Sequence, residues 1–272
     1  MGKLKASTSK MISVLLVILL AFPVVFVFGW MVLSSFKTNQ QINQIPPVWL
    51  FQPTLNNYMN TIRTTPFLRY FLNSAIIAFA STAIGLSLGL PAAYGLARYL
   101  HKGFGSLILS ARIFPGVSYL VPWFILFLNI GWIGDYRSII LAHTVITLPL
   151  VTWIMIPFFE TLPKELEEAS LIDGCSRLSS FVKIGLPIVK PGIIAATVLS
   201  FIYSWNDFKF SLILTRSRTR TLPVAMQSFI AEAAIDWGSV MASTTLMILP
   251  IIAFVFLTQQ HIVKGLQMGS IK

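Results

Sequence analysis

Charged side chains are scarce in this chain of 272 residues: Asp, Glu, Lys and Arg together make up 11%, and only nine residues are acidic. Apolar residues make up 56%, above the roughly 45 to 50% of soluble globular proteins. The net charge of +11 does not indicate a nucleic-acid partner, because the basic residues stand singly between apolar runs and form no stripe. Composition therefore excludes a soluble globular chain and predicts a polytopic membrane protein.

The motifs of enzyme active sites are also missing. No stretch matches the phosphate-binding pattern G-x-x-x-x-G-K followed by Ser or Thr, so the chain should not bind ATP through a P-loop of its own. It has no nucleophile elbow, no H-E-x-x-H pair and no C-x-x-C pair. We expect no catalytic residue and no cofactor in this chain, and an ATP-driven step would need a separate subunit.

Cysteine and histidine are rare. The lone cysteine, Cys175, excludes an intrachain disulfide. His101, His143 and His261 are too far apart in sequence to indicate a metal site. Because His143 lies in an apolar run, we interpret it as a hydrogen-bonding residue between helices rather than as a metal ligand.

Six long apolar runs are present, each near or above the roughly 20 residues that cross a bilayer. The first is too long for a signal peptide and lacks a cleavage site, which predicts an uncleaved anchor. The second is rich in Ala, Gly and Ser, which predicts close packing inside a helix bundle. Polar residues interrupt the fifth near its outer end. The predicted spans are Met11–Leu33, Phe71–Ala97, Phe104–Leu128, Ser138–Phe159, Ile193–Leu214 and Val240–Val263.

The distribution of Lys and Arg predicts the orientation of these spans. With the N-terminus inside the cell, eleven basic residues lie inside and seven outside, and the inner connections are richer in them for their length. Both termini and the segment between the fourth and fifth spans are then cytoplasmic. We expect an all-α fold of six transmembrane helices in a single domain over residues 1–272, with its core at about 71–264.

A polar segment, Glu167–Gly192, separates the fourth and fifth spans and is the organising feature of a predicted hairpin at about 160–191. It reads as two short helices. Pro163 suits a first helical position, and Gly174 suits a left-handed C-cap. Ser176 could cap the second helix, which Pro187 is expected to stop.

The hairpin also carries groups that suit a docking surface. Ala169 and Ser170 permit another backbone to approach closely, and Glu167, Glu168 and Asp173 offer carboxylates to a basic partner. The alternative is an amphipathic connector that lies on the lipid headgroups, and helical periodicity alone favours it.

A resemblance favours docking instead. The residues that carry it are Glu168-Ala169-Ser170, Asp173-Gly174, Phe181, Ile184 and Leu186-Pro187. They resemble the Glu-Ala-Ala loop of bacterial ABC importer permeases, although Ser170 and Cys175 stand where alanine is usual. The Trp205-Asn206 pair and the ending Ile262-Val263, Gly265-Leu266, Gly269 and Lys272 resemble the smaller permease subunit of maltose-type carbohydrate importers.

The resemblance implies a type I ABC importer permease in the bacterial cytoplasmic (inner) membrane, in contact with lipid. It also implies a second homologous permease subunit, an ATPase dimer that binds ATP and Mg, an extracytoplasmic solute-binding protein and a sugar substrate. Glu168 would meet a basic residue of the ATPase, Gly174 would set the elbow, and Leu186 and Pro187 would complete the coupling motif. The loop Thr215–Ser239 would reach into the binding protein; the alternative is a plain solvated connector.

Candidate pathway residues lie in two spans. Asn206 and Asp207 could hydrogen-bond sugar hydroxyls, while Tyr203 and Trp205 could stack on sugar faces; equally, the group could anchor the outer interface, with Asp207 paired to Lys209. Arg112 lies about 12 Å into the third span and should face a partner or a wet cavity. It could bind an acidic group of the substrate, snorkel inward, or satisfy carbonyls freed by Pro115.

Other functions stay open at this point. The cargo of an ABC permease could instead be a polyol, glycerol phosphate, an acidic sugar or another polar solute. A secondary transporter would need an internal repeat with paired charges at the membrane midplane, and we find no convincing repeat. A membrane enzyme would need clustered catalytic groups, which the sequence lacks.

Overall fold

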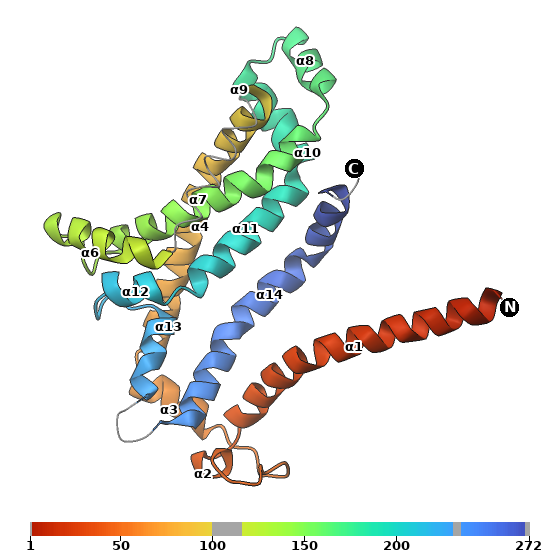
Figure 1. Ribbon diagram of the computed structural model, residues 1–272. Helices are drawn as coiled ribbons and strands as arrows, with labels where there is room; N and C mark the ends of the chain where they lie inside the picture. Colours follow the sequence, from red (N-terminus) through yellow and green to blue (C-terminus); the bar gives the residue numbers. More distant parts are fainter. Residues whose placement is uncertain (1, 100–115, 231–234, 270–272) are drawn as a thin grey trace. The chain divides into compact units, whose positions relative to one another are not determined.

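The computed structural model describes residues 2–99, 116–230 and 235–269. In these ranges the regular structure is helical, apart from an isolated antiparallel bridge between Ile230 and Ile235. This confirms the all-α class. The long helices, drawn in Figure 1, are α1 (Gly2–Ser35), α4 (Phe67–Tyr99), α7 (Tyr136–Glu160), α11 (Lys190–Trp205) and α14 (Trp237–Gly269).

Shorter helices connect them. Near the first long helix lie α2 (Asn39–Ile42) and α3 (Asn56–Thr64), and before α7 lie η1 (Gly116–Tyr119) and α6 (Leu120–Asn129). The connection from α7 to α11 holds α8 (Lys164–Ile172), α9 (Arg177–Ser180), η2 (Phe181–Gly185) and α10 (Leu186–Ile188). After α11 come α12 (Lys209–Leu214), α13 (Leu222–Ala225) and η3 (Met226–Phe229).

Four of the described helices are long and apolar enough to cross a membrane: Lys10–Ser35, Phe67–Tyr99, Tyr136–Glu160 and Trp237–Gln259. They correspond to the first, second, fourth and sixth predicted spans. The fifth is α11, which stops at Trp205 and resumes as α12, so its predicted interruption is confirmed. The third falls partly on residues 100–115, outside the described ranges, and continues as the apolar stretch Gly116–Asn129. Six spans and cytoplasmic termini stay predictions.

The chain divides into two compact units. The first comprises Met1–Phe67 and Met226–Leu249, and the second comprises Leu68–Ala225 and Pro250–Lys272. In the first unit, the Asn57 side chain is buried and its amide nitrogen donates to the carbonyls of Ser35 (2.8 Å) and Lys37 (2.7 Å). These bonds fix the chain that leaves α1 against α3.

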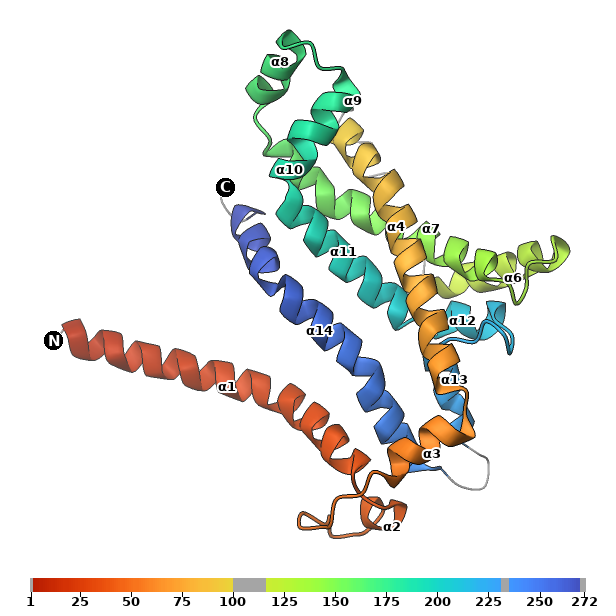
Figure 2. The ribbon, with the colours of Figure 1, turned by 180° about the vertical axis from the view of Figure 1, so that it is seen from behind.

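In the second unit, α4, α7 and α11 form the packed core, and Figures 1 and 2 both show α7 beside α11. A Cβ atom added at Gly85 or Gly89 of α4 would lie 2.8 Å from the side chain of Thr147 or Val151 of α7. Glycine permits this approach because it has no Cβ atom, and close backbone packing stabilises helix pairs in lipid, where the hydrophobic drive between helices is absent. The glycine face of the second span is packed against α7, whereas Leu72, Phe79 and Leu88 of the same helix are exposed, so the position of this span inside the bundle stays a prediction.

Aromatic rings close one end of this core, where the polar hairpin begins. The rings of Tyr94 on α4, Phe159 on α7 and Phe181 on η2 are centred 4.9 to 6.0 Å apart. All three side chains are buried. The helices on either side of the hairpin are therefore joined to α4 through a packed apolar base, formed by Tyr94, Phe159 and Phe181.

Candidate functional site

The predicted hairpin is present. Helix α8 ends at Ile172, Gly174 adopts a left-handed φ of 87°, and its backbone nitrogen donates to the Leu171 carbonyl at 3.1 Å. Ser176 begins the second helix, because its hydroxyl accepts from the Ser179 backbone nitrogen at 3.2 Å. The glycine elbow and the serine cap are confirmed. Pro163 is the N-cap of α8 rather than its first helical residue.

The expectation that Pro187 stops the second helix is wrong. Helical structure runs from Arg177 through Pro187 to Ile188, because η2 is a π-helical turn in which the Leu186 nitrogen donates to the Phe181 carbonyl. The wider turn gives room to a proline ring that would clash with an ordinary preceding turn. The chain bends by 80° after Ile188 instead, before α11. Leu186 is half-buried and Pro187 is exposed.

The three acidic residues that the sequence assigned to docking, Glu167, Glu168 and Asp173, differ in their surroundings. The Arg98 side chain of α4 bonds the Glu167 carboxylate at 2.9 and 3.0 Å and also donates to the Leu162 carbonyl at 2.6 Å. The side chains of Arg98 and Glu167 are only 6% and 14% exposed. Glu168 and Asp173 are exposed. Glu167 therefore joins the hairpin to the core, whereas Glu168 and Asp173, like Glu165, are open to a partner.

The two small residues of the motif, Ala169 and Ser170, also differ in exposure. Ala169 is exposed, whereas the buried Ser170 hydroxyl lies 2.7 Å from the Ser180 hydroxyl of α9 and 2.7 Å from the Glu167 carbonyl. Ser170 thus closes the hairpin on itself. Beside the elbow, Ile172 is 86% exposed and Leu178 is 71% exposed. An exposed apolar tip flanked by free carboxylates is a surface that suits a protein partner.

Where α11 ends, some of the predicted pathway residues are exposed and others are buried. Tyr203 and Asn206 are exposed. Trp205 is 1% exposed, and its ring lies 5.3 Å from that of Phe71 and 5.6 Å from that of Phe201. Its packing is that of a core residue. Arg112 lies outside the described residues.

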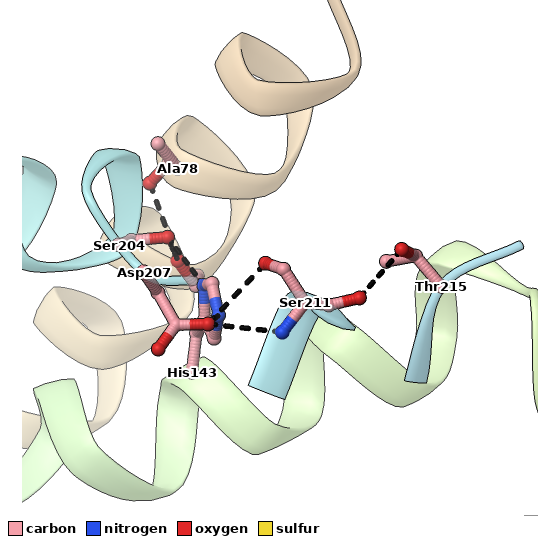
Figure 3. A network of polar contacts seen from close by, with 7 residues as sticks. Ala78, His143, Ser204, Asp207, Ser211 and Thr215 are labelled. Atoms are coloured by element: carbon pink, nitrogen blue, oxygen red, sulfur yellow. Dashed lines mark hydrogen bonds and ion pairs between the residues drawn. The ribbon is translucent and has the colours of Figure 1, made fainter. Parts of the chain in front are cut away.

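Asp207 belongs to a buried polar network that joins α4, α7 and the α11–α12 break (Figure 3). His143 Nε2 lies 3.1 Å from Asp207 Oδ1, and His143 Nδ1 lies 2.6 Å from the Ser204 hydroxyl. The Ser81 hydroxyl of α4 donates to that of Ser204 at 3.0 Å. The interpretation of His143 as an interhelical hydrogen-bonding residue is confirmed. The pairing of Asp207 with Lys209 is wrong, because the exposed Lys209 side chain makes no ion pair within the described ranges.

The predicted outer loop, Thr215–Ser239, begins in the second unit and ends in the first. In the second unit, the Asn73 amide of α4 donates to the carbonyls of Arg218 (3.0 Å) and Arg220 (2.8 Å). In the first unit, Asp236 accepts from Asn39 at 2.8 Å and Asn60 at 3.1 Å. Burial acts to raise the pKa of Asp236, but hydrogen bonds from Ser239, Asn39 and Asn60 outweigh it and hold that pKa below its ordinary value. Both ends of the loop are therefore anchored.

The described residues form a helical fold with several membrane-length apolar helices and a polar hairpin between two of them, which is the build of a polytopic membrane protein. Comparison with known families gives the finer result. Residues 1–268 match the family described as binding-protein-dependent transport system inner membrane component. The chain belongs to this family, and is an inner-membrane protein.

Three curated relatives are named as permease proteins of transport systems. The chain is 37% identical over 269 residues to a probable ABC transporter permease protein of Sinorhizobium fredii, covering 98% of this chain and 97% of the relative. It is 35% identical to the sulfoquinovosyl glycerol transport system permease protein of Agrobacterium fabrum, covering 89% and 87%. It is also 35% identical to the trehalose/maltose transport system permease protein of Thermococcus litoralis, covering 94% of each chain.

Solved structures show the fold. A chain of a bacterial ABC transporter involved in the import of the acidic polysaccharide alginate superposes with a TM-score of 0.78 at 19% identity, covering 95% of this chain and 98% of that one. An inward-facing methionine ABC transporter gives a TM-score of 0.59 at 17% identity, covering 73% and 95%. The ABC importer permease fold predicted from the sequence is therefore confirmed.

Proposed function

We propose that this chain is the permease subunit of an ATP-driven importer that moves a sugar or oligosaccharide inward across the membrane. The observation that carries this proposal is the cargo named for its full-length relatives: trehalose/maltose and sulfoquinovosyl glycerol. Each relative is 35% identical to nearly the whole chain, so the helices that would line a pathway are shared rather than a single motif.

The hairpin couples this subunit to a separate ATPase. Glu168 and Asp173 pair with basic residues of the ATPase surface, and Ile172 and Leu178 fill an apolar recess beside them. ATP and Mg bind between the two ATPase subunits. When these subunits close, the hairpins are drawn together and the helices rotate as rigid bodies from inward-facing to outward-facing. The Arg98–Glu167 pair and the aromatic base transmit that pull to α4 and α7.

The pathway is shared with a second, homologous permease subunit. Tyr203 and Asn206 are exposed where α11 ends, at a position where a sugar between two subunits would contact them. The Tyr203 ring offers an apolar face to a sugar ring. The Asn206 side-chain nitrogen donates one hydrogen to the Ile202 carbonyl at 3.0 Å, which leaves its second hydrogen and its oxygen for sugar hydroxyls. A binding protein delivers the sugar at the outer side, where the loop Thr215–Ser239 meets it.

An acidic solute is the second candidate cargo. The observation that favours it is the relative named for sulfoquinovosyl glycerol, which carries a sulfonate. Arg112, which the sequence places inside a span, would be its counter-charge. Uptake of a neutral and an acidic saccharide by Arg112→Ala separates the two cargoes: a loss confined to the acidic one supports an acidic cargo, and equal losses exclude this role of Arg112.

Co-purification in mild detergent tests the proposed function. The tagged chain is expected to retain a second permease and a P-loop ATPase encoded beside it. ATP hydrolysis by this complex should rise when its binding protein and a sugar are added together. A purified chain that moves solute unaided, or a complex whose ATPase activity no sugar changes, would contradict the proposal.

A further inference from the structure

His143 is a buried histidine for which the proposed function has no use. It lies on α7 with no exposed surface, and both ring nitrogens are bonded: Nδ1 to the Ser204 hydroxyl at 2.6 Å and Nε2 to Asp207 Oδ1 at 3.1 Å. Ser204 and Asp207 are themselves 5% and 7% exposed. A histidine so held joins α7 to two points of the chain where α11 ends.

The donors and acceptors of the network match when Asp207 Oδ1 acts as an acceptor. Nε2–H of His143 then donates to Asp207, so Nδ1 accepts from the Ser204 hydroxyl, and Ser204 in turn accepts from Ser81 at 3.0 Å. Each donor in this series of hydrogen bonds, from Ser81 to Asp207, has a partner. Figure 3 shows the His143 ring between Ser204 and Asp207, with Ser211 beyond the carboxylate.

Asp207 passes this constraint to the next helix. The same carboxylate oxygen that contacts His143 accepts from the Ser211 backbone nitrogen at 3.0 Å and the Ser211 hydroxyl at 3.3 Å. It thereby satisfies a backbone donor in the first turn of α12, which no side chain of the preceding residue caps. Asp207 thus holds the orientation of the backbone between α11 and α12, and His143 holds the Asp207 side chain in place.

Two of the predicted pathway residues, Tyr203 and Asn206, are exposed at this break, as are Phe208 and Lys209. Asp207 points inward, and its neighbour Asn206 points outward on the same side as Tyr203, three residues earlier. We propose that His143 is a positioning residue: through Asp207 it holds the face formed by Tyr203 and Asn206 toward the passing sugar. This inference rests on the proposed function for its sugar, but the positioning itself can be measured without one.

Two substitutions at His143 separate its hydrogen bond to Asp207 from its hydrogen bond to Ser204. A glutamine carries its amide nitrogen at about the reach of Nε2 and can still donate to Asp207, whereas the shorter asparagine reaches only the Ser204 side. A matched control is Thr152→Val, which removes another buried hydroxyl of α7 that donates to the Leu148 carbonyl. All variants are made in the assembled transporter in membranes, relative to a Cys175→Ser parent.

The first readout is maleimide labelling of Asn206→Cys, at an exposed position, and of Phe210→Cys, where the native side chain is 2% exposed. In the parent, in His143→Gln and in Thr152→Val, the cysteine at position 206 should react at least about tenfold faster than the cysteine at position 210, which is reached only when the break opens. A buried hydrogen bond to a charged group opposes such opening by about that factor or more. In His143→Asn this contrast should collapse. An unchanged contrast in His143→Asn overturns the proposal.

The second readout is uptake of trehalose and maltose per assembled complex. His143→Gln and Thr152→Val should retain it and His143→Asn should lose about tenfold or more, as one buried charged hydrogen bond predicts. Equal loss in the glutamine and asparagine variants would make His143 merely structural and overturn the proposal. If the parent takes up no sugar, the proposed function fails, and the labelling contrast still decides whether His143 positions the break.

Discussion

Breaking the Arg98–Glu167 pair should detach the hairpin from the core. Both side chains are largely buried, and the guanidinium serves the carboxylate and the Leu162 carbonyl together. Removing one partner of a buried ion pair costs about 3 to 5 kcal/mol, because the other charge is left unpaired. At about 1.4 kcal/mol per factor of ten, the lower figure raises the open population of the hairpin by a factor on the order of 100.

Hydrogen exchange measures this opening in the assembled transporter. Amides of η2 and α9 that are slow in the wild type should exchange on the order of 100 times faster in Glu167→Leu. Arg98→Met should cost more, because it also leaves the Leu162 carbonyl without its partner. The double variant should recover most of the loss of Arg98→Met, because no charge remains buried.

Either of two results would refute this reasoning. One is exchange in both single variants within about twofold of the wild type, which would place the pair among exposed ion pairs of little net value. The other is a double variant whose loss equals the sum of the single losses, since residues in direct contact should be non-additive.

Three further predictions concern other contacts. Glu168→Arg should leave insertion unchanged but prevent co-purification of the ATPase, because Glu168 is exposed and has no structural duty; normal transport would count against the assignment. Gly174→Val should cost about 1 to 2 kcal/mol in hairpin stability, seen as faster local exchange, because a branched residue is strained at a φ of 87°. Because the pKa of Asp236 is held below its ordinary value of 3.8, its carboxylate stabilises the first unit at pH values above 3.8, and this stabilisation is lost as the pH falls through the lowered pKa of the folded state. Protection around Asn60 should therefore fall at acid pH, and Asp236→Asn should flatten that dependence.

Much of the fold followed from local sequence. Apolar length located the described spans, and the glycine and serine preferences located the elbow at Gly174 and the cap at Ser176, because these depend on a few neighbouring residues. The sequence alone predicts that Pro187 ends the second helix, whereas a π turn over Phe181–Gly185 lets the helix continue to Ile188. Residue preferences do not indicate a π turn, which is rare.

The candidate sites were harder to predict where partners lie far apart in sequence. Glu167 and Glu168 are adjacent and chemically alike, yet only Glu167 meets Arg98, 69 residues away. Asp207 has Lys209 nearby in sequence but bonds His143, 64 residues away, because α7 and α11 are neighbours in the bundle. The one available signal was a histidine and an aspartate in separate apolar spans, which would be costly to bury unless they met.

The most direct test of the coupling role uses the lone cysteine of the chain, Cys175, which is half-buried at the hairpin elbow. Labelling by a membrane-impermeant maleimide is compared in right-side-out and inside-out vesicles, with the ATPase present or stripped away. Cys175 should react only from the cytoplasmic side, and the bound ATPase should slow that reaction. Labelling from the external side, or a rate that the ATPase leaves unchanged, would contradict the account.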